Sequence, residues 1–121
     1  MKPAPFAYHC PTSLDEALAL LAEHGDEAKV LAGGQSLVPM MAFRLARPSV
    51  LVDLNRLPGL SGVEVAGDVV TVGAMVREHA AERSSDLLER VPLLAEALPL
   101  IGHAAIRSRG TIGGSLSHAD P

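Results

Sequence analysis

A segment near the N-terminus constrains the fold more than any other part of the sequence. Residues 29–32 form a short apolar run typical of a buried strand, and the glycine pair 33–34 ends it. A short helix is predicted from Ser36, its N-cap, through Leu45. Residues 49–53 form a second buried strand. Two short strands joined through a helix pair in parallel, so the segment predicts a βαβ unit.

The flanking sequence supplies elements of both kinds. Apolar residues at helical spacing predict a helix over residues 14–24, with Ser13 and Glu16 as a capping box and Gly25 after its end. Residues 63–72 alternate in polarity on both sides of a Gly-Asp pair, which predicts a β-hairpin. The fold class is therefore α/β (α+β).

The last third of the chain is predicted to be mostly helical. Helical segments are expected over residues 76–82, 85–90, 92–101 and 104–108. Pro99 would remove a backbone hydrogen bond, so the third segment is expected to kink or end near Leu98. A second glycine turn follows at residues 110–115, and no closing helix or strand is predicted after it.

Composition and charge exclude several functions. The chain has 10 Lys+Arg against 14 Asp+Glu and only 2% aromatic residues, which removes the usual basis for nucleic-acid binding. Its single cysteine, Cys10, excludes an internal disulfide and favours a reducing compartment, so a cytoplasmic location is expected. No apolar run suggests a membrane span or a signal peptide. The five histidines never have helical metal-ligand spacing, and no metal site is predicted.

Two glycine turns are the best candidates for ligand binding. At residues 32–36, Ala-Gly-Gly-Gln-Ser, paired glycines between a strand and a helix let backbone N–H groups approach an anion such as a phosphate. At residues 111–115, Thr-Ile-Gly-Gly-Ser, hydroxyls flank a second glycine pair. Neither segment matches a P-loop or the GxGxxG fingerprint. A purely structural role stays open for each turn taken alone.

Several polar residues near these turns have two interpretations. Arg107 and Arg109 either neutralise a phosphate or are solvated. Asp53 either binds a ligand or caps the turn at Asn55, and capping is favoured. His118 follows the second turn closely enough to contact a ligand, and a surface or packing role is equally open. No residue is predicted to be catalytic, because no nucleophile lies in a recognisable motif.

Three segments resemble the FAD-binding medium subunit of molybdenum hydroxylases, a family that includes aerobic carbon monoxide dehydrogenase and xanthine dehydrogenase. They are residues 29–37, 72–75 and 106–116, and the N-terminal residues 6–17 are also similar. The motifs AGGQS and TIGGS in this order are far more specific than either alone. Ser115 stands where xanthine dehydrogenase-like relatives usually have asparagine, which favours the carbon monoxide dehydrogenase type.

The resemblance implies an FAD-binding domain of the PCMH (vanillyl-alcohol oxidase-like) type. Its N-terminal βαβ subdomain would span about residues 1–56, and residues 57–121 would begin a second subdomain, with the family's C-terminal domain absent. The cofactor would be FAD, with backbone amides of both turns on the pyrophosphate. The implied cofactor-binding residues are Ala32, Gly33, Gly34, Gln35, Ser36, Leu37, Ile101, Thr111, Ile112, Gly113, Gly114, Ser115, His118 and Asp120.

The same resemblance implies a role in an oxidoreductase complex. Electrons would pass from iron–sulfur clusters through FAD to an acceptor, and the partners would be a molybdopterin-binding large subunit and an iron–sulfur small subunit. The alternative is a truncated or non-catalytic assembly module that cannot hold FAD without further chain or a partner. Carbon monoxide, xanthine-like heterocycles and aldehydes all stay open as substrates of the molybdenum subunit.

Overall fold

The computed structural model describes all 121 residues, which form two compact units, Met1–Pro58 and Gly59–Pro121. The first unit is built on a three-stranded parallel sheet in the order β1-β3-β2. Its strands are β1 (Ala7–His9), β2 (Ala28–Leu31) and β3 (Val50–Asp53). All four residues of β3 are buried, as expected for the central strand of a parallel sheet. The predicted βαβ unit is confirmed.

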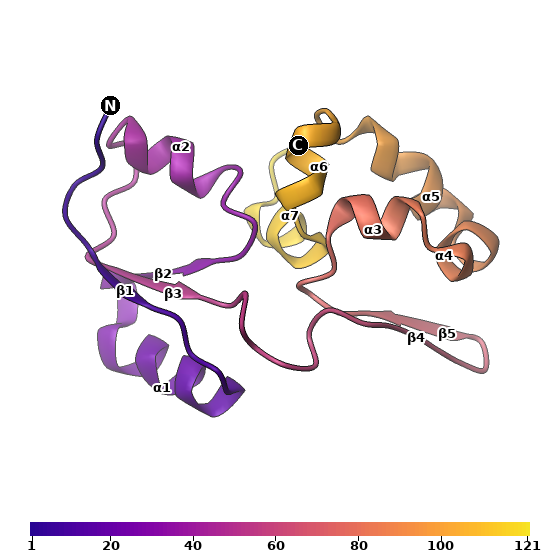
Figure 1. Cartoon of the computed structure of the whole chain (residues 1–121), viewed down its shortest axis with the longest axis horizontal. Coiled ribbons are helices and arrows are strands. Elements are labelled where there is room, and N and C mark those ends of the chain that lie inside the picture. Colours follow the sequence, from indigo (N-terminus) through magenta and orange to yellow (C-terminus); the bar gives the residue numbers. More distant parts are fainter. The chain divides into compact units, whose positions relative to one another are not determined.

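Two helices cover this sheet. Helix α1 (Leu14–His24) joins β1 to the 3₁₀ turn η1 (Gly25–Glu27) and β2, and helix α2 (Leu37–Ala42) joins β2 to β3. The connection from β1 to β2 passes across β3, and the connection from β2 to β3 runs back in the opposite direction. Because crossovers between parallel strands are right-handed, this reversal places α1 and α2 on opposite faces of the sheet (Figure 1). The predicted bounds of α1 are confirmed, and the Ser13 hydroxyl accepts from the Glu16 amide at 3.2 Å.

Helix α2 begins where the sequence predicts but ends earlier. Ser36 is the N-cap of α2, as predicted, but it has helical backbone angles and its side chain makes no capping hydrogen bond. The helix ends at Ala42 rather than Leu45, because Arg44 adopts a left-handed conformation with φ of 58°. The amide of Leu45 then returns to the carbonyl of Met40 at 2.8 Å, which closes the helix end.

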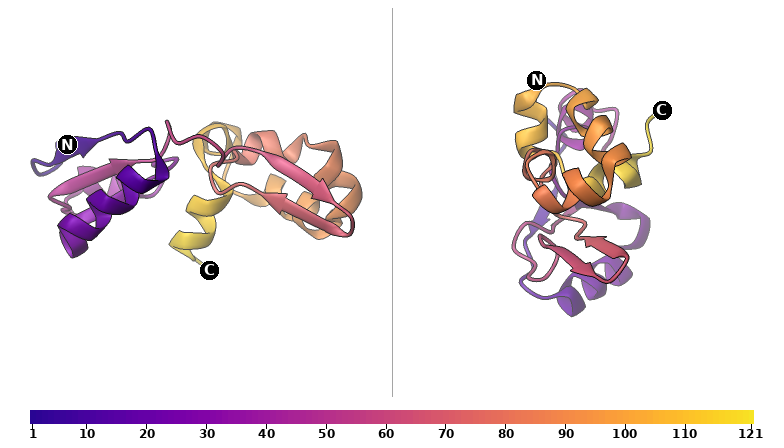
Figure 2. Two further views of the ribbon diagram at one scale, coloured as in Figure 1. Left: turned by 90° about the horizontal axis from the view of Figure 1, so that it is seen from below. Right: turned by 90° about the vertical axis from the view of Figure 1, so that its right-hand side faces the viewer.

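The second unit combines a hairpin with short helices. Strands β4 (Val63–Ala66) and β5 (Val69–Val72) pair antiparallel, as predicted. The helical segments are α3 (Glu78–Glu82), α4 (Ser85–Arg90), α5 (Pro92–Ala97), η2 (Leu98–Leu100), α6 (Ala104–Arg109) and α7 (Ile112–His118). Figure 2 shows α3, α4 and α5 on one side of the hairpin. The core between them is formed by Val76, Ala81, Leu87 and Leu98, with hairpin valines packed against it.

The glycine-rich segment at the C-terminal end is helical, contrary to the prediction of a turn with no closing helix. Thr111 is the N-cap of α7, and its hydroxyl accepts from the Gly114 amide at 3.0 Å. Gly113 lies in the first turn of α7, with its amide 2.8 Å from the carbonyl of Ala74. Capping and packing therefore override the low helix propensity of two adjacent glycines.

Candidate functional site

The first glycine turn, residues 32–37, joins the end of β2 to the start of α2. Gly34 has a φ of 74°, a conformation that favours glycine, and a Cβ there would lie 3.1 Å from Val38 Cγ2 and 3.2 Å from Leu31 Cδ1. The backbone amides of residues 33–37 donate to no acceptor within the chain. Successive amides of this kind form a concave set of donors that suits an anion.

A hydrogen-bond network supports this turn from the end of β3. The carboxylate of Asp53, which is 8% exposed, accepts from the Tyr8 hydroxyl at 2.5 Å and from the Asn55 amide at 2.8 Å. The side-chain nitrogen of Asn55 also donates to Asp53 at 2.6 Å and to the carbonyl of Ala32 at 2.9 Å. Asp53 thus caps the turn at Asn55, as predicted, and Asn55 holds the first residue of the glycine turn.

Two members of this network, Tyr8 and Asn55, were not among the predicted site residues. Their role depends on contacts between strands that are distant in sequence, and the only local signal is an asparagine two positions after a strand-ending aspartate. The hydrogen bond to Asp53, followed by that to Cys10, raises the pKa of the Tyr8 phenol above its usual value. Tyr8 therefore acts as a donor to the carboxylate across the neutral pH range.

The second glycine segment, residues 111–115, differs from the first turn because its backbone amides after Thr111 have acceptors within the chain. Its four amides after Thr111 all donate within the unit: Ile112 to Val76, Gly113 to Ala74, and both Gly114 and Ser115 to Thr111. A Cβ on Gly113 would lie 2.7 Å from Ala74, so glycine is required for the close approach of these backbones. The amides of residues 112–115 therefore already have acceptors within the unit, and the groups of this segment that remain available to a ligand are side chains.

Ser115 is exposed and is bonded to a buried carboxylate that sequence analysis did not single out. Its hydroxyl donates to Glu78 Oε1 at 2.5 Å, and Glu78 is 1% exposed. At the start of a short helix, Glu78 has the sequence pattern of an ordinary solvated residue. Only the distant contact with Ser115 distinguishes it.

The other predicted residues lie around the helices of the second unit. Ile101 is half-buried after η2, whereas His118 and Asp120 are exposed at and beyond the end of α7. Arg107 forms an ion pair with Glu82 at 2.9 Å and also donates to the Ile101 carbonyl at 2.9 Å. These contacts give Arg107 a structural role.

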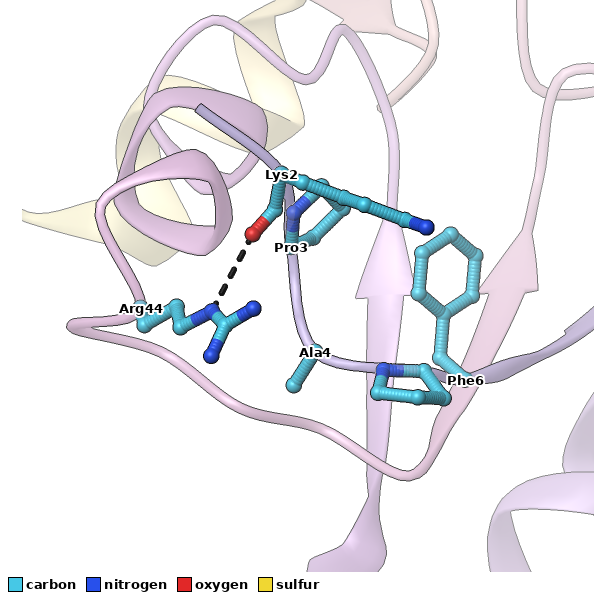
Figure 3. A pocket seen from close by; sticks show the side chains of 6 residues that line it. Lys2, Pro3, Ala4, Phe6 and Arg44 are labelled. Atoms are coloured by element: carbon cyan, nitrogen blue, oxygen red, sulfur yellow. Dashed lines mark hydrogen bonds between the residues drawn. The ribbon is translucent and has the colours of Figure 1, made fainter.

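An open groove of about 450 Å³ lies elsewhere on the first unit (Figure 3). It is lined by Lys2, Pro3, Ala4, Pro5, Phe6 and Arg44. Arg44 Nε donates to the carbonyl of Lys2 at 3.1 Å, whereas the Lys2 side chain extends away from Arg44 toward Phe6 (Figure 3). None of the residues predicted to bind a ligand lines this groove.

Comparison with known proteins defines the class to which this fold belongs. Residues 4–121 match the family model described as the FAD binding domain in molybdopterin dehydrogenase. The chain belongs to this family, and FAD is its cofactor, as the resemblance in sequence implied.

Individual relatives agree with the family assignment. The chain is 49% identical to the alpha subunit of the 6-hydroxypseudooxynicotine dehydrogenase complex of Paenarthrobacter nicotinovorans, over 99% of this chain and 40% of the relative. It is also 49% identical to the carbon monoxide dehydrogenase medium chain of Hydrogenophaga pseudoflava, over 100% of this chain and 42% of the relative.

A solved structure confirms the fold. Carbon monoxide dehydrogenase from Hydrogenophaga pseudoflava, in a form that lacks the Mo-pyranopterin moiety of the molybdenum cofactor, superposes with a TM-score of 0.97 and 50% identity. The match covers 100% of this chain and 42% of that one. The chain thus spans about two fifths of the length of the relatives it matches.

Proposed function

We propose that this chain supplies part of the FAD site of a molybdenum-containing dehydrogenase. The observation that carries the proposal is the run of backbone amides at residues 33–37 that donate to no acceptor within the chain. FAD contains a pyrophosphate, and its oxygens accept hydrogen bonds from such amides without a basic side chain. This explains how a chain with a net charge of −4 binds an anionic cofactor.

The residues proposed to contact FAD come from both glycine segments and from the helices of the second unit. They are Ala32, Gly33, Gly34, Gln35, Ser36, Leu37, Ile101, Thr111, Ile112, Gly113, Gly114, Ser115, His118 and Asp120. Because the amides of the first turn have no acceptor within the chain, they are proposed to bind the phosphates. The amides of the second segment already have acceptors, so its side chains are proposed to contact FAD. Bound FAD supplies the redox chemistry, and the chain binds and orients it.

The whole protein's role is proposed from its relatives. Their names describe a medium chain and a subunit of a dehydrogenase complex. We propose that electrons pass from iron–sulfur clusters of a small subunit through FAD to an acceptor, with a molybdopterin-binding large subunit as the second partner. No helix here is long and apolar enough to cross a membrane. The single cysteine supports a cytoplasmic location.

Titration with FAD tests cofactor binding directly. The purified chain, freed of flavin, is titrated with FAD while flavin fluorescence is followed, and saturable one-to-one binding is expected. Riboflavin, which lacks the phosphates, is expected to bind more weakly. A chain that shows no saturation up to ~1 mM FAD, a binding free energy of only about 4 kcal/mol, contradicts the proposal and supports the assembly module that needs further chain or a partner.

A glycine substitution tests the role of the first turn. Gly34→Ala introduces a side chain at a φ of 74° and is expected to weaken FAD binding about tenfold, because strain of about 1–3 kcal/mol displaces the donor amides. Gly25→Ala is the matched control, since Gly25 has a φ of 51° at the end of α1 and lies outside the turn. Equal losses in both variants would mean that general instability, not the turn, governs affinity.

A further inference from the structure

Glu78 is a buried carboxylate in the second unit whose surroundings are unusual. It is 1% exposed, its Oε1 accepts from the Ser115 hydroxyl at 2.5 Å, and its Oε2 has no hydrogen-bond partner. A Cβ added to Gly110 would lie 2.4 Å from Oε2, so the carboxylate fills the space that a side chain at position 110 would need. The Glu78 side chain is therefore enclosed and oriented toward Ser115.

The hydrogen bond to Glu78 fixes which way the Ser115 hydroxyl points. A serine hydroxyl has one proton and two acceptor lone pairs, and a carboxylate only accepts. Because the Ser115 proton is directed inward to Glu78, the exposed side of Ser115 Oγ presents lone pairs. The Ser115 amide does not change this, since it already donates to the carbonyl of Thr111 at 3.0 Å.

We infer that Glu78 is a positioning residue that makes Ser115 an acceptor-only contact, whose ligand partner is a hydroxyl group of the cofactor rather than a phosphate oxygen. This inference rests on the proposed function, because FAD carries hydroxyls on its ribityl chain and its ribose. Phosphate oxygens at neutral pH are themselves acceptors, and they match the free amides of the first turn instead.

Substitutions at Ser115 test whether its hydroxyl accepts from the ligand. Because Ser115→Ala also leaves the buried Glu78 carboxylate without its hydroxyl donor, the free energy of unfolding of each variant is measured by urea unfolding beside its ligand affinities. Ser115→Ala is expected to weaken FAD binding about tenfold, the effect of losing one hydrogen bond and leaving a ligand hydroxyl unpaired. Ser115→Thr retains the hydroxyl and should restore binding. Affinity for inorganic pyrophosphate should be unchanged in Ser115→Ala.

Two further probes identify the hydroxyl. Loss of riboflavin affinity in Ser115→Ala would assign the contact to the ribityl chain, and loss of ADP affinity with pyrophosphate affinity unchanged would assign it to the ribose. Either outcome supports the inference. A loss of pyrophosphate affinity as large as that for FAD would show that Ser115 donates to phosphate and would overturn it.

Glu78→Gln tests the positioning role. The amide keeps an acceptor at nearly the same place but loses the charge, so FAD affinity should fall less than in Ser115→Ala, and the double variant should be no weaker than Ser115→Ala alone. A merely structural Glu78, acting independently of the Ser115 hydroxyl, would instead make the double variant bind FAD more weakly than Ser115→Ala alone. Wild-type chain that fails to bind FAD overturns both proposals, whereas wild-type binding with unaffected variants overturns only this inference.

Discussion

Gly113→Ala separates helix propensity from packing, because the two predict opposite changes in stability. Gly113 lies in the first turn of α7, and alanine there should stabilise the helix by up to about 1 kcal/mol on propensity alone. A Cβ at this position, however, would lie 2.7 Å from both the Cβ and the carbonyl oxygen of Ala74, and 2.9 Å from its Cα. Such contacts with backbone force α7 to move.

The size of the effect follows from these contacts. Overpacking costs about 1–3 kcal/mol, and the Gly113–Ala74 backbone hydrogen bond of 2.8 Å, worth about 1 kcal/mol, lengthens as α7 shifts. After the gain in helix propensity, we expect the free energy of unfolding to fall by about 2 kcal/mol. With a urea slope of about 1.5 kcal/mol/M, the unfolding midpoint drops by roughly 1.3 M.

Urea unfolding followed by circular dichroism at the helical band measures this change, and hydrogen exchange of the α7 amides localises it. Gly62→Ala is the matched control in the same unit, because a Cβ there meets no atom within 4 Å and its φ is not in the left-handed region. Its stability should be unchanged or slightly higher. If Gly113→Ala is as stable as Gly62→Ala or more so, the packing argument fails.

Two other predictions concern charged and titratable groups. The absorbance titration of Tyr8, the one tyrosine of the chain, should have its midpoint above the ordinary value of about 10, and Asp53→Asn should lower it. Because the pKa of the Tyr8 phenol is raised in the folded state, the stabilisation from its hydrogen bond to Asp53 is fully present below the unfolded-state pKa and is lost as pH rises through the folded-state pKa. A titration midpoint that Asp53→Asn leaves unchanged would refute this hydrogen bond as the cause. Arg107→Gln should lower the free energy of unfolding by about 2 kcal/mol, since it leaves the largely buried Glu82 carboxylate without its charged donor. Arg109→Gln is the control, because this side chain is exposed and its replacement should leave the free energy of unfolding in urea nearly unchanged. If both variants lose the same free energy of unfolding, the ion pair is not the cause.

Elements with strong local signals could be predicted from the sequence. Helix α1 has a capping serine at Ser13 and a glycine at Gly25, and both signals act within a few residues of the helix ends. The hairpin and the parallel strands also follow from short apolar runs separated by turn residues. The end of α5 before Pro99 has the same local origin, since proline lacks the backbone donor.

Features that depend on contacts distant in sequence could not be predicted. The segment at Gly113 has the composition of a turn, and the local cap at Thr111 makes it helical only together with the packing on Ala74, which is distant in sequence. Similarly, Glu78 and Ser115 are 37 positions apart, so no local pattern connects them. Within the candidate site, the first glycine turn was identifiable from strand and helix signals, whereas its support by Asn55 was not.

The network at the end of β3 gives the chain a built-in optical reporter. Tyr8 is the one tyrosine, there is no tryptophan, and its hydroxyl donates to the carboxylate that also holds Asn55 against Ala32. The fluorescence of the Tyr8 phenol depends on its hydrogen bond to the Asp53 carboxylate. Intrinsic fluorescence of the unlabelled chain therefore comes from a single site, beside the first glycine turn, and movement of that turn registers as a change in its intensity.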